Sequence, residues 1–201
     1  MQMSLVPITY KKRASVLIIG SMRSGKTHTL IEIGKQFPGN VIAVEPAFNT
    51  RKSGRDLLSL ATENGFATCS FGKDGIPQNL CENHYEKLML FDEIHLYEVF
   101  DCLEQFFTLY YRLKSNHCSL VLAGIGFNAF AKFAPFSIWT RLIREAESVH
   151  VLSCLLPCSF CGKMGFDVLY SAPDAAVQEE NPVGDEYKNM CVACYMARYY
   201  R

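Results

Sequence analysis

One segment near the start of the chain has the residue types and spacing of a phosphate-binding loop. It consists of Gly20, Ser21, Met22, Arg23, Ser24, Gly25, Lys26 and Thr27, which fits the pattern G-x-x-x-x-G-K-[ST]. Glycines allow the backbone to curl so that its N–H groups point at a phosphate, and the start of a following helix adds partial positive charge. Lys26 would reach the terminal phosphates, and the Thr27 hydroxyl would ligate Mg²⁺. The pattern therefore predicts a site for ATP with Mg²⁺.

An acidic pair, Asp92 and Glu93, follows the apolar run Leu88–Phe91. In a chain with a phosphate loop, Asp92 would hold the magnesium shell and Glu93 would lie next to the terminal phosphate. Glu93 would then accept the proton of an attacking hydroxyl in a kinase, or orient water in an ATPase. The alternative for Asp92 is a capping role at the start of the helix expected from Tyr97.

Four of the nine cysteines form two Cys-x-x-Cys pairs in the last quarter of the chain. The pairs are Cys158 with Cys161 and Cys191 with Cys194. Four soft thiolates suit tetrahedral Zn²⁺ in a closed structural site, which would close the loop of 29 residues between the pairs. Reduced structural cysteines or a redox pair are the alternative. Because four thiolates complete one zinc site, His28 and His95 are expected to pack or to support neighbouring groups. The odd cysteine count favours a reducing, cytoplasmic compartment over a disulfide framework.

Alternating strands and helices must position these residues. The apolar runs that predict strands are Ser15–Ile19, Val41–Val44, Ala67–Phe71, Leu88–Phe91, Ser119–Ala123 and Val149–Leu152. The segments that predict helices are Lys26–Phe37, Arg55–Glu63, Tyr97–Lys114 and Trp139–Glu147. Because strands that are apolar on both faces must be covered on both, we expect an α/β fold with a mostly parallel sheet between helices.

The composition of the chain changes after residue 152. From there on, Cys, Gly, Pro and acidic residues follow without periodicity, so we expect a P-loop nucleotide-binding core over residues 1–152 and a small zinc-binding domain over residues 153–201. Lys plus Arg equals Asp plus Glu at 20 each, so the basic character of a nucleic-acid-binding protein is missing. No apolar run predicts a signal peptide or a membrane span. We therefore expect neither nucleic acid nor membrane as a partner.

The combination of motifs resembles the zinc-containing thymidine kinase family over nearly the whole chain. The resemblance is carried by Gly-x-Met-x-Ser-Gly-Lys-Thr, the Asp-Glu pair, Gly-Ile-Gly-Phe-Asn-Ala-Phe, the two Cys-x-x-Cys pairs and Val-Gly-Asp-Glu-Tyr before the second pair. It implies a RecA-like core with a zinc-held lasso, and transfer of the γ-phosphate of ATP to the 5′-hydroxyl of thymidine. It also implies a homo-oligomer, either a tetramer or a dimer.

The resemblance assigns roles to individual residues. Glu93 would be the general base, with Lys26 and Arg51 close to the reacting phosphates. The residues that would contact the nucleoside are Met22, Leu96, Phe130, Phe136, Val183 and Tyr187. The alternative for Met22, Phe130 and Phe136 is an ordinary position in the core.

Several residues depart from the family pattern on the nucleoside side of the site. They are Asn49 in place of Asp, Leu96-Tyr97 in place of two aromatics, a longer segment without Asp after Gly124, and Tyr170 in place of Arg. We therefore expect phosphoryl transfer to be retained and the preference for base or sugar to differ. Two alternatives stay open: a divergent nucleotide-binding protein with a regulatory role, and a RecA-like ATPase or zinc-ribbon nucleic-acid protein. The neutral charge disfavours the last of these.

Overall fold

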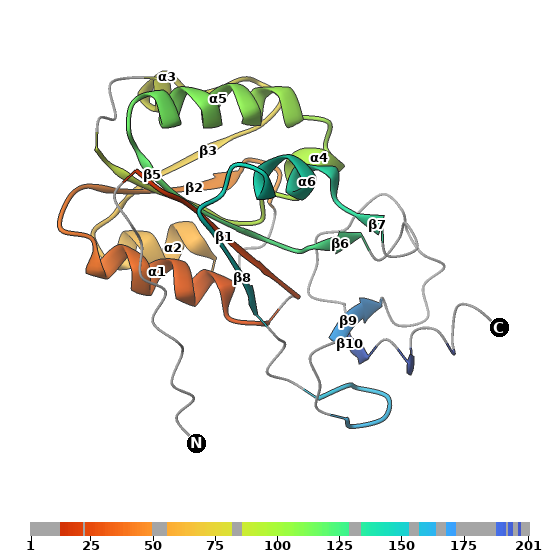
Figure 1. Cartoon of the computed structure of the whole chain (residues 1–201). Coiled ribbons are helices and arrows are strands. Elements are labelled where there is room, and N and C mark those ends of the chain that lie inside the picture. The colour runs from red at the N-terminus through yellow and green to blue at the C-terminus, as the bar shows by residue number, and fades with distance from the viewer. Residues whose placement is uncertain are drawn as a thin grey trace.

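A six-stranded parallel β-sheet with helices on both faces forms the centre of the computed structural model (Figure 1). The structure describes residues 13–21, 23–49, 56–81, 86–128, 134–152, 157–163, 168–171, 188–191, 193–194 and 197. The strands of the sheet are β1 (Ser15–Gly20), β2 (Val41–Pro46), β3 (Ala67–Phe71), β4 (Leu88–Phe91), β5 (Ser119–Gly124) and β8 (Ser148–Leu152). The helices are α1 (Lys26–Gln36), α2 (Leu57–Glu63), α3 (Gln78–Cys81), α4 (Leu96–Val99), α5 (Leu103–Ser115) and α6 (Ser137–Ile143). None of the helices in these ranges combines the length and hydrophobicity that a membrane span requires.

The order of the strands in the sheet is β3-β2-β4-β5-β1-β8. All neighbouring pairs are parallel, so the carboxyl ends of the strands meet at one edge. Gly20 ends β1 at this edge, and Asp92 and Glu93 follow β4 at the same edge. The two segments that the sequence assigns to phosphate and magnesium are therefore on one side of the molecule, with only β5 between their strands.

Alternate residues of the central strands enter two separate cores. Leu17 of β1 packs with Phe106 of α5 on one face of the sheet, and Ile18 packs with Leu30 of α1 on the other. In Figure 1 the helices α3, α5 and α6 lie above the sheet, and α1 and α2 lie below it. The predicted α/β fold with a sheet covered on both faces is confirmed. The edge strands β3 and β8 are the exception, because many of their side chains are exposed.

The single helix predicted over Tyr97–Lys114 is wrong, because two helices, α4 and α5, occupy this part of the chain. Asp101 lies between them with a φ of 55°, which is in the left-handed region and ends an α-helix. Phe100, beside the break, stacks on Phe48 with ring centroids 4.4 Å apart. Apolar residues keep helical spacing across the break, so the sequence pattern did not reveal it.

The helix α6 begins and ends earlier in the chain than the sequence predicts. Its start is held by Glu98 of α4, whose carboxylate accepts hydrogen bonds from the backbone N–H groups of Ser137 at 3.0 Å and Ile138 at 2.9 Å. Glu147, the last residue of the predicted helix, instead bonds to Ser15 of β1 through its backbone N–H and its carboxylate. Contacts with distant parts of the chain therefore decide both ends of this helix.

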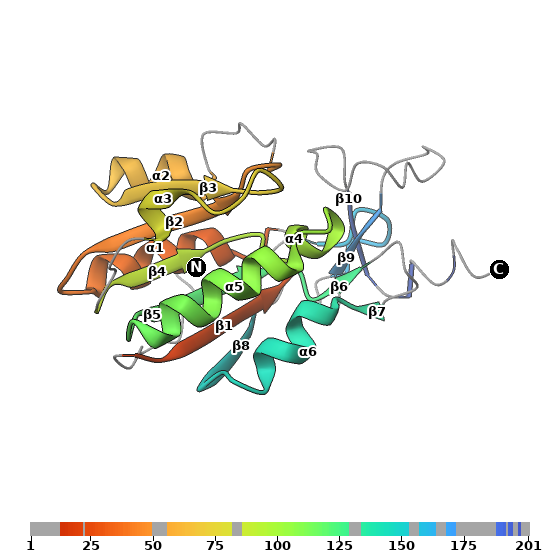
Figure 2. The same ribbon diagram turned by 90° about the horizontal axis from the view of Figure 1, so that it is seen from above.

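Two small antiparallel sheets complete the described part of the chain. One consists of β6 (Phe127–Asn128) and β7 (Ala134–Pro135), and the other of β9 (Val168–Ser171) and β10 (Lys188–Cys191). Both lie beyond the carboxyl edge of the main sheet (Figures 1 and 2). The sequence predicted none of these four strands, because each is too short to show a periodic pattern.

Candidate active site

The phosphate loop connects β1 to α1. At two positions of this loop, the backbone admits only glycine. Gly25, the residue before α1, has a φ of 85°, where other residues are strained. At Gly20, an added Cβ would lie 2.5 Å from the Ser24 hydroxyl oxygen and 2.7 Å from the carbonyl oxygen of Leu152. Both glycines of the sequence pattern are therefore required by the curled backbone. Met22 of this loop lies outside the described residues.

The polar groups of the loop suit a bound phosphate. The hydroxyls of Ser21 and Ser24 are buried and have no hydrogen-bond partner in the described part of the chain. A buried hydroxyl without a partner is unfavourable, and a phosphate oxygen would supply the missing hydrogen bond. Lys26 is 5% exposed, and its Nζ donates to the backbone oxygen of Ser21 at 2.8 Å. Its charge is therefore directed into the loop, while Arg23 is exposed to solvent.

Asp92 contacts the phosphate loop directly. Its Oδ2 accepts a hydrogen bond of 2.5 Å from Thr27 Oγ1, and its Oδ1 accepts one of 2.8 Å from the backbone N–H of Glu93. Burial raises the pKa of Asp92 and the Glu93 carboxylate raises it further, whereas Lys26 and the Thr27 hydroxyl lower it. A hydroxyl and a carboxylate oxygen side by side are the hard oxygen ligands that Mg²⁺ prefers. The residues present therefore fit magnesium at this position.

The alternative role for Asp92, a cap of the following helix, is wrong. The N-terminal capping position of α4 is occupied by His95, without a capping hydrogen bond from a side chain. The carboxylate of Asp92 bonds instead to Thr27 and Glu93.

Glu93 lies in a backbone conformation that is unusual for its residue type. Its φ is 51°, and non-glycine residues in this left-handed region are concentrated at functional sites. The residue is 8% exposed, and its Oε2 lies 3.5 Å from Nδ1 of His95. The next residue, Ile94, donates its backbone N–H to the carbonyl oxygen of Ala123 at 3.1 Å, which attaches this segment to β5. The carboxylate is therefore held at the carboxyl edge of the sheet, one residue from Asp92.

A third buried carboxylate, Glu45, lies at the carboxyl end of β2 and was missed by the sequence analysis. One of its oxygens accepts from the backbone N–H of Leu57 at 2.6 Å, and the other accepts from Asn49 Nδ2 at 3.2 Å. Burial raises the pKa of Glu45 to about 7, and the charge of Asp92 contributes in the same direction. The signal was available: a glutamate ends the apolar run of β2, as the acidic pair ends β4.

The residues predicted to contact a nucleoside are only partly described. Leu96 is 2% exposed in α4, and Phe136 is 5% exposed and packs against the ring of His95 with centroids 5.2 Å apart. Met22, Arg51, Phe130, Val183 and Tyr187 lie outside the described residues. Leu96 and Phe136 are thus buried in the interior near Glu93. Their contact with a nucleoside stays a prediction.

Tyr97, which follows Leu96 in α4, is fully buried in the core. Its ring stacks on Phe71 with centroids 4.6 Å apart and on Phe106 with centroids 5.1 Å apart. Burial raises the pKa of Tyr97 well above its usual value, so the hydroxyl stays neutral.

The two cysteine pairs come together in the structure. The sulfur atoms of Cys158, Cys161, Cys191 and Cys194 all lie within 4.8 Å of one another. Tetrahedral zinc with Zn–S bonds of about 2.3 Å requires sulfur atoms about 3.8 Å apart, and Sγ of Cys161 lies 3.7 Å from Sγ of Cys191. The cluster therefore has the dimensions of a zinc site.

Cys158 also has the electrostatic surroundings of a metal ligand. Burial by itself would raise the pKa of this thiol, but backbone N–H groups of Cys191, Cys161 and Phe160 lower the pKa to about 6. Thiolates, not thiols, bind zinc, so these N–H groups favour the form that a metal needs. The four sulfur atoms therefore form a cluster that could hold a metal ion, and a closed structural zinc site stays a prediction.

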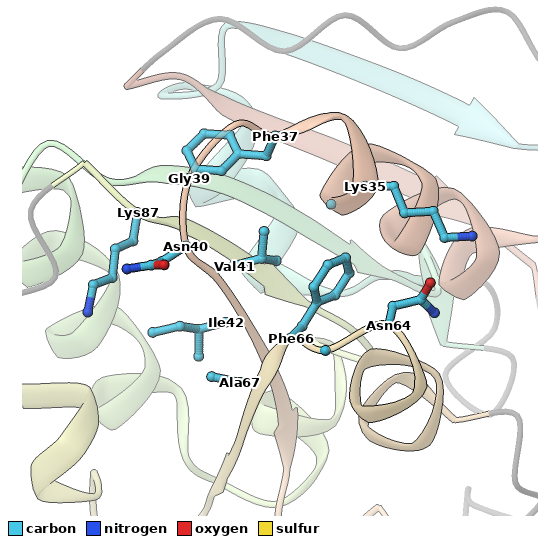
Figure 3. Close-up of a pocket in the computed structure, with 12 residues that line it drawn as sticks. Lys35, Phe37, Gly39, Asn40, Val41, Ile42, Asn64, Phe66, Ala67 and Lys87 are labelled. Carbon is cyan, nitrogen blue, oxygen red and sulfur yellow. The ribbon is translucent and has the colours of Figure 1, made fainter.

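A cavity of about 580 Å³ lies at the opposite edge of the sheet, where β2 and β3 begin. Figure 3 shows Phe37, Val41 and Phe66 in its wall, with Lys35 and Lys87 at its sides. None of the residues that the sequence analysis assigned to a site lines this cavity. It is therefore separate from the phosphate loop and the acidic pair.

Comparison with known families adds an independent observation. A family model described as thymidine kinase matches residues 14–195 of the chain. A search of curated protein sequences finds no match. The matched range includes the phosphate loop, the acidic pair and both cysteine pairs.

Proposed function

Because the chain belongs to the thymidine kinase family, we propose that it transfers the γ-phosphate of ATP to the 5′-hydroxyl of thymidine or a related deoxynucleoside. The observation that supports this most directly is the bond of 2.5 Å between Thr27 of the phosphate loop and Asp92. It joins the segment that would hold the triphosphate to the strand end that carries Glu93. A kinase needs its phosphate-binding loop and its general base side by side, because the acceptor hydroxyl must meet the terminal phosphate.

Each residue of this site has a physical task in the proposed reaction. The loop N–H groups, the hydroxyls of Ser21 and Ser24, and Lys26 bind the phosphates of ATP and balance their charge. Thr27 and Asp92 would hold Mg²⁺, which would neutralise charge on the terminal phosphates. Glu93 accepts the proton of the 5′-hydroxyl, so that the oxygen electron pair can form the new bond to phosphorus as the bond to ADP breaks. The products are the nucleoside monophosphate and ADP.

The proposal includes further properties that the family suggests. The cysteine cluster holds one structural Zn²⁺ at the base of the lasso in residues 153–201, and residues 1–152 form the nucleotide-binding core. Arg51 acts near the phosphates, and Met22, Phe130, Val183 and Tyr187 contact the nucleoside. The protein works as a cytoplasmic homo-oligomer, a dimer or a tetramer, with a small deoxynucleoside as its partner.

A coupled assay of ADP release tests the proposed reaction. It is run with thymidine, deoxyuridine, deoxycytidine and deoxyguanosine, and with Lys26→Ala as the control for contaminating kinases. We expect turnover on thymidine or deoxyuridine that is lost in the control variant, with a base preference that differs from that of typical family members. Tight ATP binding without turnover on any of the four nucleosides would instead support a regulatory nucleotide-binding protein.

A further inference from the structure

We propose that the cavity of about 580 Å³ at the opposite edge of the sheet binds a small organic anion with an aromatic body. The cavity lies where β2 and β3 begin, at the end of α1, whereas the phosphate loop and the acidic pair lie at the carboxyl edge. Its volume is within the range of about 300 to 1,000 Å³ that is usual for small-molecule sites. The site is independent of the proposed kinase reaction, because none of the described residues assigned to that reaction lines it.

Two phenylalanine rings form the apolar wall of the cavity. Phe37 follows α1 and Phe66 precedes β3, and both are partly buried against the core on the α1 side of the sheet. The ring of Phe66 lies against the backbone of α1 at Gly34, where an added Cβ would be 2.7 Å from the ring. Phenyl rings favour aromatic neighbours, because stacked and edge-to-face contacts add to the effect of apolar burial. The wall therefore suits a ligand with a flat aromatic body.

Polar side chains lie on both sides of this wall. Figure 3 shows Lys87 next to Asn40 on one side of the cavity, and Lys35 next to Asn64 on the other. None of the described residues that line the cavity is acidic, so the formal charges at its rim are positive. Lysine side chains donate hydrogen bonds and never accept them, and their bonds to charged acceptors are among the stronger ones. The rim therefore suits a carboxylate, sulfonate or phosphate group.

Neighbouring negative groups do not cancel the charge of the two lysines. Glu86 bonds to Arg13 at 3.1 Å, and Glu32 bonds to Lys35 at 2.8 Å. The second pair has side chains that are 46% and 41% exposed, and exposed ion pairs are weak, so a ligand can compete for Lys35. The ends of α1 and α2 each carry only about half a negative charge, which is less than the full charge of one lysine.

The test uses two fluorescent probes that share one ring system. Anilinonaphthalene sulfonate is an anion, and phenylnaphthylamine is its neutral counterpart. Each probe is titrated into the full-length protein and into Lys26→Ala, in which the phosphate loop has lost its charge. We expect one saturable site per chain in both proteins. The Kd of the anion should be below about 1 mM and lower than that of the neutral probe by about threefold or more.

Variants of the cavity show where the probe binds. Lys87→Gln and Lys35→Gln should each raise the Kd of the anion by about threefold, and together by about tenfold, without changing the binding of the neutral probe. Lys87→Arg keeps the charge and should bind the anion as the wild type does. Ala67→Phe fills the cavity without altering any charge, so it should abolish binding of both probes. Lys73→Gln, at an exposed position outside the cavity, is the control and should have no effect.

Several results would overturn the inference. They are an unchanged Kd in Ala67→Phe, the lack of saturable binding of the anion below about 1 mM, or a loss of binding in Lys26→Ala, which would place the probe in the phosphate loop. Thermal unfolding of each variant shows whether it is folded, and the comparison of Lys87→Gln with Lys87→Arg decides if Ala67→Phe is unstable. A protein that binds the anion but has no turnover on any deoxynucleoside would keep this site and lose only the proposed function.

Discussion

The hydroxyl of Thr27 lies 2.5 Å from Oδ2 of Asp92, which joins two residues that are 65 positions apart in the chain. Thr27 is in the first turn of α1 and Asp92 follows β4. The strands that lead to them, β1 and β4, are both neighbours of β5. The bond therefore depends on the strand order of the sheet, and it places two oxygen ligands where magnesium would accompany a bound triphosphate.

Asp92→Asn should weaken the use of magnesium more than the folding of the protein. The amide cannot supply the negative charge that draws the cation to Thr27, so we expect the Mg²⁺ concentration for half-maximal turnover to rise by about tenfold or more. A magnesium titration of turnover at saturating ATP measures this. Asp101→Asn, an exposed position where asparagine tolerates the positive φ, is the matched control. An unchanged magnesium requirement in Asp92→Asn would remove Asp92 from the metal site.

Glu93→Gln should separate binding of ATP from turnover. Glutamine has nearly the same shape but cannot accept the hydroxyl proton, so we expect kcat to fall by about a hundredfold or more with little change in ATP affinity. Turnover and equilibrium binding of an ATP analogue are measured on the same preparation. Glu104→Gln, on the exposed side of α5, should behave like the wild type in both assays. Normal turnover of the Glu93 variant would exclude this residue as the base.

Cys158→Ser should release the metal from the cysteine cluster. Wild-type protein is expected to contain one zinc per chain by mass spectrometry of the intact protein under native conditions, and the variant to contain less than about a tenth of that amount. If zinc holds the lasso against the nucleoside, affinity for the nucleoside should fall before affinity for ATP does. Cys69→Ser, outside the cluster, is the control and should keep its zinc. Equal zinc content in both variants would show that the cluster is not the metal site.

Glu45 should make the free energy of unfolding depend on pH. Burial raises its pKa from 4.5 to about 7 in the folded chain, so the native state binds this proton more tightly than the unfolded state does. The resulting stabilisation is complete below the unfolded pKa and is lost as pH rises through about 7, with a total of up to about 3 kcal/mol. Glu45→Gln should remove this decline, because the glutamine has no proton to lose.

Denaturant unfolding at several pH values between about 5 and 8 measures this difference. The comparison is made between Glu45→Gln and the exposed Glu104→Gln, since other groups that titrate in this range contribute equally to both variants. A decline of the same size in the two variants would mean that Glu45 does not hold its proton near neutral pH.

Much of the fold could be predicted because its signals are local. The six strands of the main sheet are short, mainly apolar runs, most of which end at glycine, proline or acidic residues, and each was located within two residues of its observed ends. The helix predicted as Tyr97–Lys114 was divided by a backbone turn at Asp101, and α6 was shifted by the carboxylate of Glu98. The turn at Asp101 lies within a segment whose apolar residues keep helical spacing, whereas the start of α6 depends on a contact with a residue about 40 positions away.

By itself, the sequence determined the phosphate loop, the acidic end of β4, the paired cysteines and the α/β class, because glycine conformation, hydrophobic period and ligand spacing are properties of neighbouring residues. Only the tertiary structure decided that Thr27 meets Asp92, that His95 faces Glu93, and that Glu45 is a third buried carboxylate at the same edge. Those relationships follow from the order of strands in the sheet and from the packing of side chains over it. Both bring together groups that lie on separate strands and turns, which no local pattern specifies.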